Sequence, residues 1–242
     1  MRRLRWSLAK RLARLNPSLR QVERLGARWE LDPRDWLDLR LIIGQPFEAE
    51  QRARFAALIA ERRPEVLYDV GANFGLYSVL MAKAAPWLRV EAFEPVSRTR
   101  AKLLRNIALN GLGDRVRVHA LALSDRAGEA EIAVDPRSSG LSTLSPSAEE
   151  AARRDFAATE RIPTARLDDL AEAAGRVIAV KIDVEGHEPA ALAGMSRLLA
   201  EATGVLQVEI RERNVEAVRA ALAAAGWREI DRIEDELYFA EP

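Results

Sequence analysis

The stretch YDVGANFG, residues 68–75, has the residue types expected where a strand turns into a helix around a ligand. Asp69 stands at the end of an apolar run, and two glycines, Gly71 and Gly75, lie four residues apart with Asn73 between them. Glycine lets the backbone pass close to a bound group, and the free N–H groups at the start of the following helix can meet a polar one. This spacing predicts a ligand site at the strand end. Gly75 also fits another interpretation, close packing of the helix.

The class of ligand follows from what this loop lacks. A dinucleotide-binding loop reads G-x-G-x-x-G, with three glycines that admit a pyrophosphate, but Asn73 stands at the place of the middle glycine. No Gly-Lys-Ser or Gly-Lys-Thr follows, so the stretch is not a phosphate-binding P-loop. The next apolar run ends in VEAFEP, where Glu94 can accept hydrogen bonds from ribose hydroxyls. These features predict a nucleoside without phosphates, and S-adenosylmethionine is the common one.

A second stretch, KIDVEGHEP at residues 181–189, gathers groups that can take up or hold a proton. Asp183, Glu185 and His187 are expected at the end of another strand and in the turn after it. The chain has two histidines, and a neutral imidazole in such a turn is a natural general base. Glu209, near the end of the next apolar run, is expected to point into the same cleft. We predict that these four side chains are catalytic.

Other interpretations of this second stretch stay open. Glu185 and Glu188 fit a capping role, because acidic side chains favour the first turn of a helix. Asp183, Glu185 and His187 also have the chemistry of ligands for a divalent metal ion. We assign no metal to the site. Lys181 shares a strand face with Asp183 and is expected to pair with it.

The elements that must position these residues alternate from residue 65 onward. Apolar runs of five to seven residues are followed by segments of helical period, which is typical of a parallel sheet with crossover helices. Strands are expected at 66–70, 89–93, 115–122, 177–183 and 205–210, and helices at 48–62, 75–85, 96–110, 189–199 and 214–225. WREID and LYFA near the C-terminus predict an antiparallel hairpin at the sheet edge, which brings the strands to seven.

Two segments lie outside this pattern. Residues 135–161 form a connection far longer than usual and predict a substrate-binding loop, with a tolerated surface loop carrying a short helix at 148–156 as the alternative. Residues 1–47 are expected to form an N-terminal helical extension, a basic helix followed by an irregular segment that covers 28–51. The α/β domain then spans 48–242.

Charge is balanced over the whole chain and uneven at its start. Lys plus Arg and Asp plus Glu number 37 each, so no global field favours nucleic acid. The first 25 residues carry eight Lys or Arg and one Glu, with Leu4, Leu8, Leu12 and Leu15 on one helical face. We favour a helix that packs these leucines on the domain. The competing interpretation is a basic amphipathic helix that contacts anionic lipid, as a peripheral membrane contact, or a partner.

The composition of the chain excludes several kinds of site and of protein. The chain has no cysteine, which excludes disulfides, thiolate nucleophiles and Cys-ligated metal centres. No apolar run approaches the length of a membrane span, and the N-terminus lacks the apolar core of a signal peptide. A cytoplasmic protein is expected. No feature of the sequence indicates an oligomeric state or identifies the acceptor.

Six stretches, DVGANFGLYS, AFEP, NIALNGL, ALALSD, RLDDL and KIDVEGHEPAALAGM, together resemble the FkbM-type methyltransferases. These are class I S-adenosylmethionine-dependent enzymes mostly associated with O-methylation of sugars, glycans and other secondary metabolites. The resemblance covers about 69–210 and implies a doubly wound, Rossmann-like, seven-stranded, mostly parallel sheet. It also implies cofactor contacts at the methionine part from Asp69, Gly71, Asn73 and Gly75, at the ribose from Glu94, and at the adenine from Ala122, Ser124 and Asp125.

The resemblance implies a small-molecule or glycan acceptor whose hydroxyl receives the methyl group. Such a transfer is an in-line displacement, so alignment of the reactants matters, and a base must take the hydroxyl proton. RNA methylation is an alternative, but no basic stripe interleaved with aromatics appears beyond the N-terminal helix, and no N-P-P-Y or D-P-P-Y motif occurs. Nucleic acid is therefore not expected as a partner. A non-catalytic binding protein of this fold is the other alternative.

Overall fold

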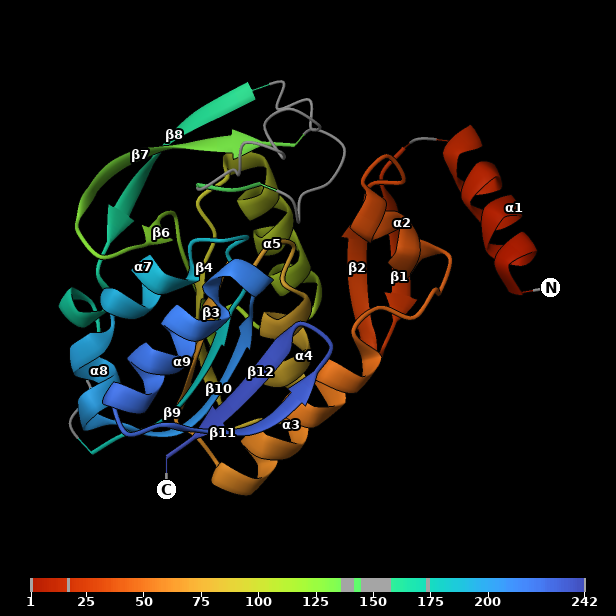
Figure 1. Ribbon diagram of the computed structural model, residues 1–242. Coiled ribbons are helices and arrows are strands. Elements are labelled where there is room, and N and C mark those ends of the chain that lie inside the picture. Colours follow the sequence, from red (N-terminus) through yellow and green to blue (C-terminus); the bar gives the residue numbers. More distant parts are fainter. Residues whose placement is uncertain (1, 17, 136–141, 145–157, 173–174, 242) are drawn as a thin grey trace.

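The computed structural model of the protein describes residues 2–16, 18–135, 142–144, 158–172 and 175–241. Its centre is a seven-stranded sheet with the strand order β11-β12-β10-β9-β3-β4-β5 (Figure 1). The strands are β3 (Val66–Val70), β4 (Arg89–Phe93), β5 (Val116–His119), β9 (Val177–Ile182), β10 (Thr203–Glu209), β11 (Arg228–Ile233) and β12 (Glu236–Ala240). Neighbours are parallel except that β12 runs antiparallel to β10 and β11. The predicted doubly wound sheet and its C-terminal hairpin are confirmed.

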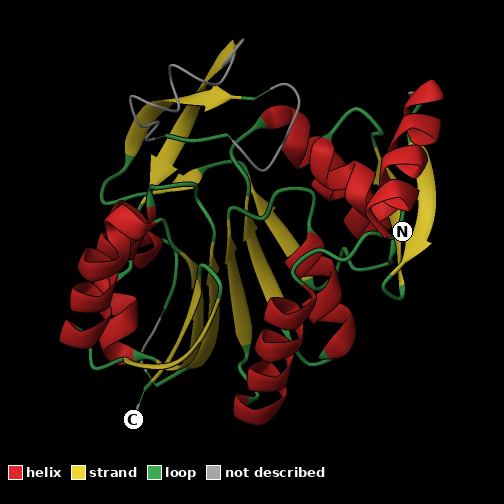
Figure 2. Ribbon diagram, turned by 45° about the vertical axis from the view of Figure 1, so that its right-hand side comes forward, coloured by secondary structure: helices red, strands yellow, loops and turns green. Residues whose placement is uncertain are grey.

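Helices cover both faces of the sheet (Figure 2). One layer holds α3 (Ala49–Arg62), α4 (Leu76–Ala84) and α5 (Ser97–Leu109), and the other holds α7 (Glu188–Ala193), α8 (Ser196–Glu201) and α9 (Val215–Ala224). Strand β3 is buried at all five positions because side chains on both of its faces meet a helical layer. The core therefore consists of two apolar clusters, one on each side of the sheet.

Two predicted elements are divided in the structure. The helix expected at 189–199 is broken into α7 and α8 around Gly194, where an added Cβ would lie 1.9 Å from the carbonyl oxygen of Ser124. The strand expected at 115–122 ends with β5, and the chain then enters β6 (Ala122–Leu123). Strand β6 belongs to a separate three-stranded sheet of order β6-β8-β7, with β7 (Gly128–Val134) and β8 (Ala158–Ala165).

This small sheet contains the described ends of the long insertion at 135–161. Strand β8 pairs antiparallel with β7, and Thr143 forms an isolated bridge with Ala133 of β7. The helix expected at 148–156 lies outside the described residues. The insertion is thus anchored at its C-terminal end by a strand that the sequence analysis placed in a loop.

The N-terminal extension has more regular structure than predicted. After α1 (Arg2–Leu15) it forms a hairpin of β1 (Arg20–Arg24) and β2 (Ala27–Leu31), then α2 (Trp36–Ile42). The expectation of an irregular segment at 28–51 is wrong. Backbone N–H groups on the free edge of β2 donate to the side chains of Asn106 and Asn110, so contacts with α5 complete this strand.

Helix α1 does not pack Leu12 and Leu15 on the domain, and the side chains of Leu4 and Leu8 lie outside the described ones. Leu12 is 58% exposed and Leu15 is 79% exposed, whereas Ala13 is buried. The favoured interpretation is therefore wrong for these two leucines, because the helix is docked through another face. None of the described helices combines the length with the apolarity that crossing a bilayer requires.

Trp29 tests whether the hairpin and the sheet form one folding unit. Its side chain is fully buried and contacts the ring of Phe74 edge-on, with centroids 5.7 Å apart. Trp29→Ala should lower the free energy of unfolding by about 3–5 kcal/mol in a single transition. Trp36→Ala, at a residue 44% exposed, should change it by about 1 kcal/mol or less. Denaturant titration followed by circular dichroism measures both, and a separate early transition for Trp29→Ala would contradict the prediction.

Candidate active site

The ends of β3 and β9 meet at Gly71. This residue has a φ of +82°, and a Cβ added to it would lie 1.9 Å from the carbonyl oxygen of Asp183. The Asp183 N–H donates to the carbonyl of Val70, 3.0 Å away, which continues the strand pairing up to the loop. Glycine is required at position 71 because both the left-handed backbone and the close approach exclude a side chain. The two predicted motifs are thereby brought into direct contact.

A first pocket opens on one side of this contact. Its polar wall includes Gly71, Asn73, Glu94 and His187. Its apolar wall is formed by Phe93, Pro95, Val96, Ala122, Leu123, Ile132, Leu144 and Val184. The pocket therefore offers polar groups near the strand ends and an apolar surface between β4 and the small sheet.

Glu94 is the buried acid of the first pocket. Its Oε2 accepts from the backbone N–H of Asn73 and its Oε1 from that of Val96, each at 2.9 Å. Burial raises the pKa of Glu94 to about 7, although the two backbone hydrogen bonds and Arg100 act in the opposite direction. Each carboxylate oxygen keeps a lone pair, so the group can still accept from hydroxyl donors.

A second pocket opens on the other side of the contact. It shares Gly71, Asn73, Asp183 and Glu185 with the first pocket. Its other walls are Trp36, Leu37, Phe47 and Glu48 from the N-terminal segment, Asp69, Ala72, Phe74, Leu76 and Tyr77 around the glycine loop, and Lys181 and Glu209 from β9 and β10. The two pockets thus meet at four residues from the predicted motifs.

Lys181 lies beneath the second pocket among acidic side chains. Its Nζ is 3.3 Å from Glu236 Oε1, 3.7 Å from Asp183 Oδ2 and 3.9 Å from Glu209 Oε2. Burial alone would lower the pKa of Lys181, but these carboxylates raise it well above its ordinary value. The expected pairing with Asp183 is confirmed. The ammonium also lies over the ring of Tyr77, 4.8 Å from the centroid.

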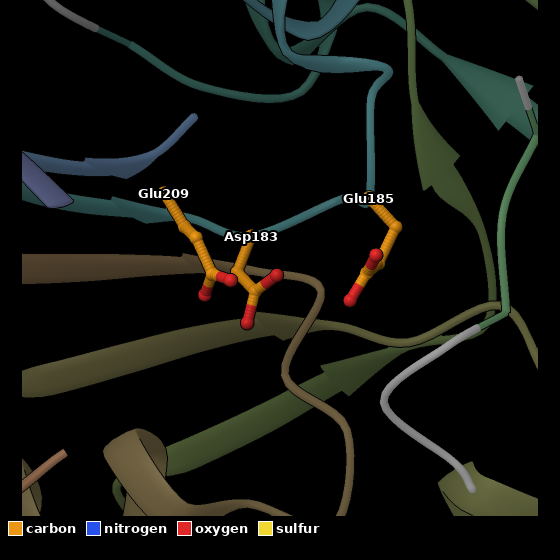
Figure 3. A group of neighbouring side chains, drawn as sticks. All are labelled: Asp183, Glu185 and Glu209. Atoms are coloured by element: carbon orange, nitrogen blue, oxygen red, sulfur yellow. The ribbon is translucent and has the colours of Figure 1, made fainter. Parts of the chain in front are cut away.

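Three carboxylates, those of Asp183, Glu185 and Glu209, extend to the same side of the strand ends (Figure 3). One oxygen from each lies within 4.8 Å of the others. Asp183 and burial both raise the pKa of Glu209, because two carboxylates this close resist ionising together. Glu185 is also paired with Arg211. This geometry can hold a cation or take up a proton.

His187 is not part of this group of three carboxylates, although it lines the first pocket together with Asp183 and Glu185. Its Nε2 lies 3.0 Å from Ser124 Oγ, which in turn donates to Asp125. It lines the first pocket, and the described wall of the second pocket does not include it. Burial lowers the pKa of His187 while Asp125 opposes this, so burial favours the neutral imidazole. Among the described residues, the ligand atoms that lie close together belong to Asp183, Glu185 and Glu209. The set considered for a metal ion from the sequence contained His187 in place of Glu209.

The other residues predicted to bind the cofactor are also found in different places. Ala122 lines the first pocket, whereas Asp69 lines the second and accepts a hydrogen bond from Ser78. Gly75 faces α5, where an added Cβ would lie 2.6 Å from Leu103 Cδ1, as the packing interpretation expects. Glu188 is buried in the first turn of α7 and accepts from the backbone N–H of Gly186, which supports capping.

Sequence reasoning missed the contribution of the N-terminal segment, above all Glu48. This residue has a left-handed backbone, with φ +46° and ψ +40°, directly before α3. Burial raises its pKa to about 7, partly offset by Lys181. No motif or spacing marks Glu48. The available signal was an acidic side chain directly before a helix, next to an aromatic residue, Phe47.

Comparison with known proteins gives one family. Residues 69–237 match the family described as the methyltransferase FkbM domain. Methyltransferase sdnD of Sordaria araneosa is 32% identical over 154 residues, covering 53% of this chain and 60% of that protein. The 31-O-demethyl-FK506 methyltransferase FkbM of Streptomyces tacrolimicus is 28% identical over 183 residues, covering 74% of this chain and 67% of that protein.

A solved structure supports the fold. The crystal structure of methyltransferase FkbM from Methylobacillus flagellatus KT superposes with a TM-score of 0.51 at 18% identity. It covers 73% of this chain and 43% of that one. The chain therefore spans about three fifths of one curated relative and less than half of this structural relative.

Gly71→Ala tests the contact between the two motifs. The added methyl group would meet the Asp183 carbonyl and the backbone would be strained, so the free energy of unfolding should fall by about 3 kcal/mol or more. Gly113→Ala is the matched control, because nothing lies within 4 Å of its Cβ position. Chemical denaturation measures both variants. Equal free energies of unfolding for the two variants would contradict the prediction, because the loop would then have moved to accommodate the methyl group.

Proposed function

The chain belongs to the FkbM methyltransferase family, and from this premise we propose that it transfers a methyl group from S-adenosylmethionine to a hydroxyl oxygen. We infer a sugar, a glycan or another secondary metabolite as the acceptor. The observation that carries the proposal is the meeting of two pockets at Gly71, Asn73, Asp183 and Glu185. Two reactants held in adjoining pockets can be aligned for direct transfer.

The first pocket suits the donor. Asn73 Oδ1 is buried and has no hydrogen-bond partner among the described residues, so it is available to a donor group such as an ammonium. Gly71 leaves open the space that a Cβ would fill. Glu94 can accept from two ribose hydroxyls, and Val96, Ala122 and the side chains around them suit the flat face of an adenine. When bound, S-adenosylmethionine supplies an electrophilic methyl group on a sulfonium centre.

The second pocket suits an acceptor that carries hydroxyl groups. Carboxylates accept hydrogen bonds from hydroxyls, and Phe47 and Trp36 offer apolar faces to a ring or chain. The acceptor hydroxyl must lose its proton as its oxygen is methylated. Asp183 and burial raise the pKa of Glu209 to about 10, so this pair of carboxylates holds one proton at neutral pH. Glu209 can take the hydroxyl proton after that proton has left to solvent, and Glu48 stands in the same pocket. Lys181 limits the repulsion among these groups.

His187 has a different role in this proposal. The sequence favours it as the general base, but it lines the donor pocket beside Ser124 and not the described wall of the acceptor pocket. We assign the proton transfer to the carboxylates of the second pocket. His187 then shapes the donor pocket from the side of Ser124 and Asp125.

Glu94 links donor binding to proton release. Burial raises its pKa to about 7 in the free protein, so part of the molecules carry a proton there at pH 7. Ribose hydroxyls favour the ionised carboxylate, lower its pKa and expel that proton. Calorimetry with S-adenosylhomocysteine at pH 7 in two buffers of different ionisation enthalpy should therefore detect release of a fraction of a proton. Glu94→Gln should weaken binding about 10- to 100-fold and abolish the release.

Glu91→Gln is the matched control for this measurement. Glu91 lies on the same strand, β4, but pairs with His119 and lines neither of the two pockets. It should leave both the affinity and the proton release unchanged. Absence of binding by folded wild-type protein would contradict the donor assignment, and wild-type affinity in Glu94→Gln would contradict the ribose contact.

Glu209 and His187 can be separated by kinetics. Glu209→Gln should lower turnover about 100-fold or more while the dissociation constant of S-adenosylhomocysteine stays within about twofold, because only the proton acceptor is lost. His187→Ala should instead weaken donor binding, and His119→Ala, outside both pockets, should do neither. Turnover is measured with methyl-labelled donor on a panel of sugars, glycans and hydroxylated metabolites. Lost turnover with intact donor binding in His187→Ala would restore the histidine as the base.

A further inference from the structure

Helix α1 is docked through the side that carries Trp6, Ala9 and Ala13, and Leu12 and Leu15 are exposed to solvent. Ala13 is buried, and Trp6 and Ala9, on the same side of the helix, are half-buried. The Arg20 guanidinium fixes the helix end by donating to the backbone oxygens of Ala13 and Asn16, each at 2.8 Å. Because each residue advances the helix by about 100°, Leu12 and Leu15 lie on a shared stripe away from Ala13.

The exposed stripe is apolar along its length and basic at its margins. Leu12 and Leu15 are 58% and 79% exposed, and Leu19, which follows the helix, is 51% exposed. Arg11 and Arg14 are exposed next to the leucines. The 14 residues of α1 include six Arg or Lys and no acidic residue, although the whole chain is neutral. Figure 1 places α1 at the outer edge of the molecule, beyond the β1–β2 hairpin.

We propose that α1 binds the protein peripherally to an anionic lipid surface. Exposed leucines flanked by arginines fit the boundary between headgroups and acyl chains, where the leucines leave water and the cations meet lipid phosphates. Charge selects this occupant over a second copy of the chain. Two α1 helices that met through this stripe would bring Arg11 and Arg14 of each copy into one interface, with no acidic residue in either helix to compensate. The proposal is independent of the methyl transfer.

Vesicle sedimentation with the full chain tests the proposal. The probes are vesicles of phosphatidylcholine alone and of phosphatidylcholine with one quarter phosphatidylglycerol, at 0.15 M and 0.5 M NaCl. We expect binding to the anionic vesicles at the lower salt, loss of most of it at the higher salt, and little binding to phosphatidylcholine alone. Leu12→Ser with Leu15→Ser should lower the partition coefficient about tenfold or more. Arg11→Gln with Arg14→Gln should lower it about 25-fold at 0.15 M salt, about fivefold per charge.

Matched controls carry the same changes elsewhere. Leu104→Ser on α5, at a leucine 50% exposed, and Arg117→Gln, at an exposed arginine on β5, should bind as the wild type does. Circular dichroism verifies that every variant is folded. Equal binding to both kinds of vesicle, or unchanged binding by both α1 variants, would overturn the proposal. So would a dimer, seen by light scattering, that the leucine changes dissolve, because the stripe would then be a contact between copies.

Discussion

The carbonyl oxygen of Asp183 occupies the space that a side chain at position 71 would need, and the site depends on this contact. Strands β3 and β9 are parallel neighbours, so their carboxyl ends reach the same edge of the sheet. A side chain at Gly71 would hold the two loops apart. Without one, the loops close on each other, and a pocket forms on each side of the place where they touch. The absence of a side chain at Gly71 therefore brings the residues of both motifs together.

The two pockets differ in their charged groups. The first pocket has Glu94, which is buried and accepts from backbone N–H groups, besides Asp183 and Glu185, which it shares with the second pocket. In the second, several carboxylates surround Lys181, and their mutual repulsion exceeds what one cation can offset, as the raised pKa of Glu209 indicates. A buried cation that lost its partners would be strongly unfavourable, and so would the carboxylates without it. The carboxylates of the second pocket therefore depend on the buried ammonium of Lys181, and it depends on them.

The sequence predicted what local pattern determines. Strands β3 and β4 have the predicted bounds, and β3 is an apolar run buried on both faces, which local pattern alone can identify. Strand β2 was missed because its edge is completed by side chains of α5, far along the chain. His187 was assigned to the acidic cluster from its nearness in sequence. The left-handed backbones of Glu185 and Gly186 reverse the chain there and send the histidine to the other pocket.

The second pocket takes part of its wall from residues that precede the region shared with the family. Trp36, Phe47 and Glu48 all lie before the matched residues 69–237, whereas every described wall residue of the first pocket lies within them. The family match therefore spans the whole described wall of the first pocket and only part of the described wall of the second. The N-terminal segment consequently contributes to the pocket proposed for the acceptor and not to the described wall of the pocket proposed for the donor.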